Sequence, residues 1–259
     1  MINLNKDLFA NPTSVGSIPA RTGKIKKVKI DNKLKELGVE IEDLSLGKFD
    51  YVGEFTAKKQ RDPNSDLYHS VGAFFRPNYE RGLLIYTLIK KYNMMSYLEI
   101  GYGRGYSCFC AAMAMNELGR GSVHTVDPAL DMTQIKNLGN VFPEEWFKKI
   151  NFIKSTSDEY FKQTPVEEGM FDMIYLDGDH RYDVVKRDWE NSQNRFRKAI
   201  LFDDYHLPGK HQKDIEVSSV VDSIEDDSKE LIIMDRRIFL DDRGYTDNQI
   251  DYGQVLITK

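Results

Sequence analysis

The sequence is poor in cysteine and has no long apolar run, and both features narrow the class of protein. Its only two cysteines, Cys108 and Cys110, lie two positions apart on a predicted helix, so their side chains diverge and a mutual disulfide is not expected. Neither fits a zinc-binding spacing, and we expect two buried core residues in a reducing cytoplasm. The longest apolar run covers residues 108–115, which is far too short to cross a bilayer of roughly 30 Å.

An excess of positive charge is also missing. Lysine and arginine number 36 against 41 aspartates and glutamates, so the net charge of −5 gives no reason to bind nucleic acid or an anionic membrane surface. The N-terminus has no basic stretch that leads into an apolar run, and no secretory signal is predicted. A length of 259 residues suits one large domain, or one domain with an appendage.

The character of the chain changes near residue 76. Residues 1–76 lack clear periodicity, and we predict an irregular N-terminal extension that caps an acceptor site, with one short helix at 32–37. The basic run at 21–29 is predicted to be a solvated strand or loop. Residues 77–259 are predicted to form one α/β domain.

Strands and helices alternate five times in that domain. The predicted helices are 78–92, 107–118, 131–149, 157–163 and 182–196, and the predicted strands are 95–100, 121–127, 150–154, 171–177 and 198–203. These strands are continuously apolar instead of two-faced, which is typical of a parallel sheet covered by helices on both sides. Two further strands, 230–234 and 252–258, are predicted as an antiparallel pair that closes one edge of the sheet.

A glycine-rich turn follows the first strand. Residues 99–107 read E-I-G-Y-G-R-G-Y-S, and glycines at a strand-to-helix turn let a ligand approach the main chain. A dinucleotide fingerprint would need its third glycine at position 106, which is Tyr106. The acid two residues before Gly101 suits a cofactor that carries a cation, and a second acid, Asp127, ends the next strand, where it can bind both ribose hydroxyls. The alternative is a turn whose glycines only allow tight packing.

These features resemble the class I S-adenosylmethionine (SAM)-dependent methyltransferases. The resemblance implies a doubly wound, Rossmann-like α/β fold whose seven-stranded sheet is mostly parallel with an antiparallel last strand. It also implies SAM as cofactor, bound by Glu99, Gly101, Gly103, Gly105 and Asp127. An adenine contact follows the third strand in this family, at Thr156 and Ser157 here, and a helix N-cap is the alternative role of these two residues.

Four carboxylates follow the fourth and fifth strands. Asp177 and Asp179 come after the fourth strand, and Asp203 and Asp204 come after the fifth. Neighbouring strands lie roughly 4.8 Å apart, so we expect these acids to meet in one crevice. Unpaired, they would repel one another and raise their own pKa values. A hard divalent cation resolves this, with Mg²⁺ first and Ca²⁺ or Mn²⁺ next, and the alternatives are helix capping and ion pairs with basic side chains.

The segment after the fourth strand narrows the resemblance. The pattern D-G-D-H-x-Y-x-x-V-x-x-D-W, which begins at Asp177, resembles the metal-dependent branch of macrolide-sugar and other sugar O-methyltransferases. The resemblance implies that Asp177, Asp203 and Asp204 hold Mg²⁺ and that Asp177 also borders the cofactor. Either Asp179 or His180 would then deprotonate the acceptor, and the sequence leaves both open.

The combined prediction is a SAM-dependent O-methyltransferase that moves a methyl group to a hydroxyl of a sugar or glycosylated small molecule with Mg²⁺ assistance. A cation lowers the pKa of the hydroxyl, and a positioned base takes its proton before the oxygen attacks the sulfonium methyl. A metal-independent N- or carboxyl-methyltransferase and a non-catalytic SAM-binding protein are the alternatives. No nucleic-acid or membrane partner is expected, and the resemblance allows a homo-oligomer.

Overall fold

The structure is a computed structural model that describes residues 25–38, 79–139, 142–164, 170–206, 215–233 and 252–259. The structural statements below concern these residues. Most of the predicted N-terminal extension, residues 1–24 and 39–76, lies outside them.

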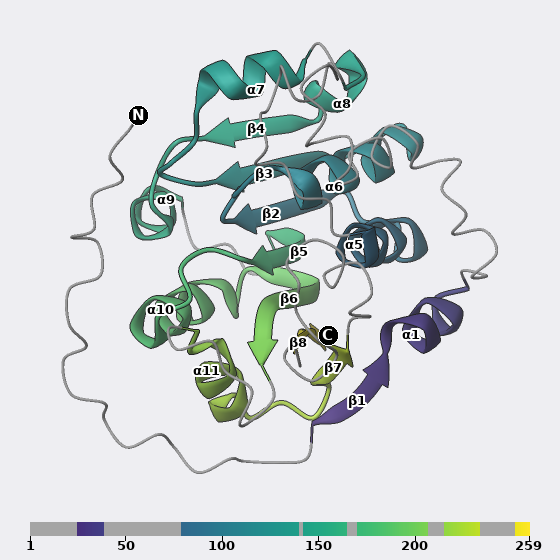
Figure 1. Cartoon of the computed structure of the whole chain (residues 1–259), viewed down its shortest axis with the longest axis vertical. Helices are drawn as coiled ribbons and strands as arrows, with labels where there is room; N and C mark the ends of the chain where they lie inside the picture. The colour runs from purple at the N-terminus through teal and green to yellow at the C-terminus, as the bar shows by residue number, and fades with distance from the viewer. Residues whose placement is uncertain (1–24, 39–78, 140–141, 165–169, 207–214, 234–251) are drawn as a thin grey trace, which may run out of the picture.

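One eight-stranded sheet forms the centre of the described part (Figure 1). Its strands are β1 (Lys26–Lys29), β2 (Ser96–Ile100), β3 (Ser122–Val126), β4 (Ile150–Ile153), β5 (Phe171–Leu176), β6 (Phe196–His206), β7 (Glu230–Ile233) and β8 (Tyr252–Thr258). Their order across the sheet is β1-β7-β8-β6-β5-β2-β3-β4. β8 runs antiparallel to both of its neighbours, whereas the other neighbouring strands pair in parallel. The predicted antiparallel last strand is therefore confirmed.

The sheet has one strand more than the seven predicted. The additional strand is β1, which comes from the basic run, pairs in parallel with β7 and leads into α1 (Ile30–Glu36). A strand was one of the two structures predicted for this run. Only Val28 of β1 is buried, while Lys27 and Lys29 are exposed, so one apolar position in four residues gave no sign that the strand joins the sheet. The predicted antiparallel pair β7–β8 exists, but it does not end the sheet, because β1 forms that edge.

Helices cover both faces of the sheet, as a doubly wound fold requires (Figure 1). One face carries α1, α5 (Tyr79–Lys91), α6 (Tyr106–Glu117), α7 (Met132–Leu138) and α8 (Glu144–Phe147), and the other carries α9 (Ser157–Gln163), α10 (Tyr182–Ser192) and α11 (Val217–Ser223). Alternate strand residues fill the two cores, with Tyr97 and Tyr175 in the first and Leu98 and Ile174 in the second. Within the described ranges, no helix is both long and apolar enough to span a membrane.

Three local predictions can be compared with the structure. Cys108 and Cys110 are free, buried thiols in α6, as predicted. The single helix predicted over 131–149 is instead two, because α8 starts anew directly after Pro143. The helix predicted over 182–196 ends at Ser192, because the ring of Phe196 is buried and its backbone already belongs to β6.

The order of the strands reverses between β2 and β5. From β2 the sheet continues to β3 and β4, and from β5 it continues in the opposite direction to β6. The two carboxyl ends stay in contact here, since the Asp177 N–H donates to the Ile100 carbonyl at 2.9 Å. Ligands of open α/β sheets bind at such a reversal point. The fold therefore brings the glycine turn after β2, the acids after β5 and the acids within β6 to one place.

Candidate functional site

The turn after β2 depends on three glycines in the left-handed region of the backbone. Their φ angles are +93° at Gly101, +52° at Gly103 and +85° at Gly105. A Cβ atom at Gly101 would lie 2.0 Å from the carbonyl oxygen of Asp177, so only glycine permits this close approach of β2 and β5. A Cβ atom at Gly103 would meet nothing within 4 Å, which leaves that side of the turn open to a ligand.

Asp127, directly after β3, holds the glycine turn in place. Its Oδ2 accepts the N–H groups of Tyr102 at 3.0 Å and Gly103 at 3.2 Å, and its Oδ1 accepts the N–H of Ala129 at 2.7 Å. A carboxylate offers about four acceptor positions, so these three bonds leave room for another donor. The predicted ribose contact is thus compatible with the role of Asp127 in ordering the turn.

Glu99 lies behind the turn and has no exposed surface. The hydroxyl of Ser107, at the start of α6, donates to its Oε1. Burial raises the pKa of Glu99 to about 8, although hydrogen bonds from Ser107 and Thr125 oppose the shift. The side chain therefore keeps its proton through most of the neutral range. Its hydrogen bond with Ser107 links β2 to α6 beneath the turn.

Thr156 is the N-cap of α9. Its hydroxyl oxygen accepts the N–H of Glu159 at 3.2 Å, and the Glu159 carboxylate accepts the N–H of Thr156 at 3.5 Å, which forms a capping box. Ser157, the next residue, hydrogen-bonds to the side chain of Asp188. The cap that the sequence offered as an alternative is therefore present at Thr156, and it uses the hydroxyl oxygen but not the hydroxyl hydrogen.

Two of the predicted metal ligands are consecutive residues of β6. Consecutive residues of a regular strand point to opposite faces, but Asp204 has a φ of +50° and the β6–β8 pairing shifts between Phe202 and Tyr205. This irregularity interrupts the alternation, so that both Asp203 and Asp204 lie close to Asp177 across the β5–β6 pair.

Arg81, which the sequence interpretation missed, lies among these acids. Its Nη1 is 3.2 Å from Asp177 Oδ2, and its Nη2 forms an ion pair with Asp203 Oδ2. In the sequence, Arg81 is one polar position of an amphipathic helix and carries no motif. Its placement depends on the close packing of α5 against α6, where a Cβ atom at Gly82 would lie 2.5 Å from Cys110 Sγ.

Burial and repulsion between carboxylates shift the titration of Asp177 and Asp204. Burial, followed by the Asp203 carboxylate, raises the pKa of Asp177 well above its ordinary value, and Arg81 opposes the shift. Burial and Asp203 also raise the pKa of Asp204 to about 6, against Arg81 and His180. Charge at these positions is therefore costly without nearby cations.

The two candidate bases have different surroundings. His180 Nε2 lies 3.1 Å from Asp204 Oδ2. Asp179 accepts the N–H of Arg181 at 2.9 Å and pairs with its guanidinium. Burial would raise the pKa of Asp179, but the hydrogen bonds and charge of Arg181 outweigh it and leave this pKa below its ordinary value. A carboxylate that is already paired and has a lowered pKa is a weak base, so the geometry favours His180.

The donor atoms beside β5 and β6 suit a divalent cation. One atom each of Asp177, His180 and Asp204 lie within 4.8 Å of one another, which bonds of about 2.0–2.6 Å to one ion can span. Asp203, the third predicted ligand, lies outside this group of three; it pairs with Arg81 and accepts a hydrogen bond from Gln254 Nε2 at 3.1 Å. The residues thus fit a cation, with Asp203 held by other partners in this arrangement.

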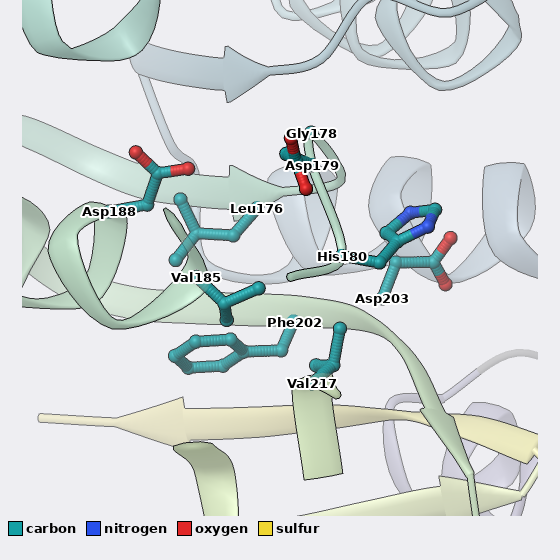
Figure 2. Close-up of a pocket in the computed structure, with 9 residues that line it drawn as sticks. All are labelled: Leu176, Gly178, Asp179, His180, Val185, Asp188, Phe202, Asp203 and Val217. Atoms are coloured by element: carbon teal, nitrogen blue, oxygen red, sulfur yellow. The ribbon is translucent and has the colours of Figure 1, made fainter. Parts of the chain in front are cut away.

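A small hollow lies beside this cluster (Figure 2). Its lining residues are Leu176, Gly178, Asp179, His180, Val185, Asp188, Phe202, Asp203 and Val217. In this view the Asp188 carboxylate lies on the opposite side of Leu176 and Val185 from His180. The hollow has room for about one water molecule, so as it stands it holds neither a nucleoside cofactor nor an acceptor.

Comparison with known proteins agrees with this geometry. Residues 98–205 match the family described as "Methyltransferase domain". An O-methyltransferase from Bacillus cereus, solved in complex with S-adenosylhomocysteine, is 14% identical with a TM-score of 0.53 over 89% of this chain and 97% of that chain. A Klebsiella pneumoniae protein, provisionally assigned as an O-methyltransferase, is 15% identical with a TM-score of 0.50 over 88% and 94% of the two chains. At these identities the likeness concerns the fold, and no curated protein matches the sequence.

The family match covers the glycine turn, Asp127 and the acids of the cluster, and leaves out Arg81. Both halves of the site thus lie within residues that match a methyltransferase domain, at the reversal point where this fold binds its ligands. Residues 98–205 therefore resemble a methyltransferase domain, and the described fold is similar to that of the O-methyltransferases compared above.

Proposed function

We propose that this protein transfers the methyl group of SAM to a hydroxyl oxygen of a sugar or of a glycosylated small molecule, with Mg²⁺ assistance. The observation that carries the proposal is the meeting of the glycine turn and the acidic cluster, where Gly101 lies directly against the backbone of Asp177. An oxygen acceptor is supported by the Bacillus cereus O-methyltransferase of similar fold. The sugar is supported by the resemblance of the pattern that begins at Asp177.

The cofactor would lie over the open side of the turn. Gly101, Gly103 and Gly105 would admit its methionine part, and Asp127 would accept ribose hydroxyls. Thr156 and Ser157, at the start of α9, would border the adenine. Glu99 would act through the turn, because its carboxyl is enclosed between β2 and α6. Asp177 would border both the cofactor and the acceptor.

His180 is the proposed base. Because Nε2 faces Asp204, the other ring nitrogen, Nδ1, would take the proton of the acceptor hydroxyl. The hydroxyl oxygen would form a bond to the methyl carbon, and the carbon–sulfur bond would break to release S-adenosylhomocysteine. Asp204, 3.1 Å from Nε2, would stabilise the imidazolium that results. Asp179 is the weaker candidate because of its pairing with Arg181.

A bound divalent cation would lower the pKa of the acceptor hydroxyl. Asp177 and Asp204 are the ligands that the geometry offers at once, and Asp203 is the third proposed ligand. With these carboxylates as ligands, His180 is left to act as the base.

The test measures S-adenosylhomocysteine formation from SAM with a panel of glycosides, using EDTA-treated protein with and without Mg²⁺. We expect turnover that needs Mg²⁺ and falls by about a hundredfold or more in His180→Ala, with a smaller loss in the matched variant Asp179→Asn. Turnover indifferent to EDTA would contradict the cation. Methylation only of amines or carboxylates would contradict the hydroxyl acceptor.

A metal-independent N- or carboxyl-methyltransferase is the second candidate, and one observation favours it. Arg81 already places a positive charge against Asp177 and Asp203, so two of the acids have a counter-ion without any metal. The same assay with amine and carboxylate acceptors in EDTA separates the two candidates.

A further inference from the structure

The guanidinium of Arg81 lies between Asp177 and Asp203, at the position that a cation bound to both acids would occupy. It reaches Asp177 Oδ2 with one nitrogen and Asp203 Oδ2 with the other. The side chain is only 20% exposed, and Asp203 is 1% exposed. An ion pair with so little access to water is screened weakly, and its partners cannot exchange it for solvent at low cost.

We propose that Arg81 is the internal counter-ion of the acidic cluster and competes with the divalent cation for Asp177 and Asp203. This inference rests on the proposed cation-assisted function. In the cation-free enzyme the guanidinium pairs with both acids and offsets one negative charge of the pair. When a cation binds, the guanidinium must withdraw from at least one of them, so Arg81 sets the affinity of the cation and is a positioning residue.

Replacement of the guanidinium by a cation would need little rearrangement around the two acids. Gln254 donates to Asp203 Oδ1 at 3.1 Å, and the Tyr175 hydroxyl lies 3.4 Å from Asp177 Oδ2. Both carboxylates therefore keep a partner when the guanidinium leaves. Gln254 itself is fixed, because it is fully buried on β8 and its Nε2 also donates to the Tyr175 hydroxyl at 3.1 Å. Only the arginine side chain needs to move.

The exchange also accounts for the place of Asp203 outside the group of three close donor atoms. The atoms that already lie within 4.8 Å of one another belong to Asp177, His180 and Asp204. Asp203 Oδ2 is paired with Arg81 Nη2. Withdrawal of Arg81 would free the Asp203 carboxylate to join Asp177 and Asp204 as a ligand, so the cation would bind in competition with an existing ion pair.

The test measures Mn²⁺ binding to EDTA-treated protein saturated with S-adenosylhomocysteine, by electron paramagnetic resonance and calorimetry. Arg81→Met removes the charge, and we expect Mn²⁺ to bind about tenfold more tightly or better than to the wild type. Arg81→Lys keeps the positive charge but loses the bidentate contact, and we expect its Mn²⁺ affinity to lie between those of the wild type and Arg81→Met. Lys90→Met is the matched control, because Lys90 lies on the same helix and pairs with Glu117, away from the acids.

Thermal unfolding gives a second readout. Without Mn²⁺, Arg81→Met should unfold at a lower temperature than the wild type, because its acids have lost their counter-ion, and Mn²⁺ should restore more stability to the variant than to the wild type. If Arg81→Met does not fold, Arg81→Lys with an affinity no higher than wild type would overturn the proposal.

Mn²⁺ affinity that is equal or lower in Arg81→Met would also overturn it, as would the absence of Mn²⁺ binding in both proteins. These failures are distinct from failure of the proposed function. If the protein binds S-adenosylhomocysteine and methylates glycosides in EDTA, methyl transfer is retained and only the competition between Arg81 and a cation is contradicted. A protein that transfers no methyl group contradicts the proposed function whatever its Mn²⁺ affinity.

Discussion

At the scale of single residues, Glu99 makes stability depend on pH. Its pKa is raised to about 8 by burial, whereas the carboxyl of an unfolded chain releases its proton near 4.5. Between these values the folded protein binds one proton more than the unfolded chain, so this group's contribution is complete below pH 4.5 and is lost as the pH rises through about 8. The loss is at most about 5 kcal/mol, at 1.36 kcal/mol for each pKa unit.

We therefore predict that Glu99→Gln flattens the fall in the free energy of unfolding between pH 5 and 8, measured by chemical denaturation. Glu145→Gln, at an exposed position of α8, is the control and should follow the wild-type curve. Parallel curves for the wild type and Glu99→Gln would contradict a protonated, buried Glu99.

Two neighbouring glycines should respond differently to alanine. Gly101→Ala forces a methyl group against the Asp177 carbonyl, so we expect a loss of several kcal/mol in the free energy of unfolding, or failure to fold. Gly103→Ala meets open space and should cost only about 1 kcal/mol for its positive φ. Because the methyl group would occupy the open side of the turn, Gly103→Ala should fold but bind S-adenosylhomocysteine at least about tenfold more weakly. Calorimetry with unchanged affinity would place the cofactor elsewhere.

At the scale of elements, the N-terminus of α9 separates a structural role from a binding role. Thr156→Ala removes the cap, and we expect a loss of about 1 kcal/mol in the free energy of unfolding, which Thr156→Ser should largely restore. If the Thr156 hydroxyl also donates to the adenine, only the alanine variant should bind S-adenosylhomocysteine more weakly. Equal affinity in both variants would leave the cap as the sole role of this hydroxyl.

The elements whose own pattern is strong were predicted well. β2, β5 and α6 lie within one residue of their expected bounds, because long apolar runs and helical spacing are local signals. The place of β1 in the sheet was not predicted, although a solvated strand was one interpretation of its residues, because this edge strand buries only one of its four residues. The bend at Asp204 was missed as well, because a left-handed aspartate inside a strand leaves no trace in the hydrophobic pattern.

At the scale of the whole molecule, opposite ends of the sheet should limit stability at opposite pH values. At the amino end of β5, Asp172 accepts the Met95 N–H at 2.6 Å and pairs with Arg197 at 2.9 Å. Burial would raise the pKa of Asp172, but the Met95 N–H and the charges of Lys198 and Arg197 outweigh it and lower this pKa below 3.8. Its contribution is therefore present above pH 3.8 and is lost as the pH falls through the lower, folded value.

We predict that Asp172→Asn is less stable than the wild type at pH 7 and that the difference shrinks in acid, the reverse of the trend at Glu99. Asp172 lies at the end of β5 away from Asp177, so its loss should leave the affinity for S-adenosylhomocysteine unchanged. Denaturation curves across the pH range and calorimetry check both statements. A stability difference that is constant with pH would contradict the lowered pKa.

The sequence by itself determined the doubly wound fold, the glycine turn, the acid after β3 and the two groups of acids, one after β5 and one within β6. Each of these is a short pattern whose parts lie within a few residues of one another. Only the tertiary structure decided that Glu99 is enclosed, that β1 completes the sheet, and that Arg81 meets Asp177, 96 positions away along the chain. A contact between residues so far apart depends on how helices pack against the sheet, and the local hydrophobic periodicity of the sequence does not indicate it.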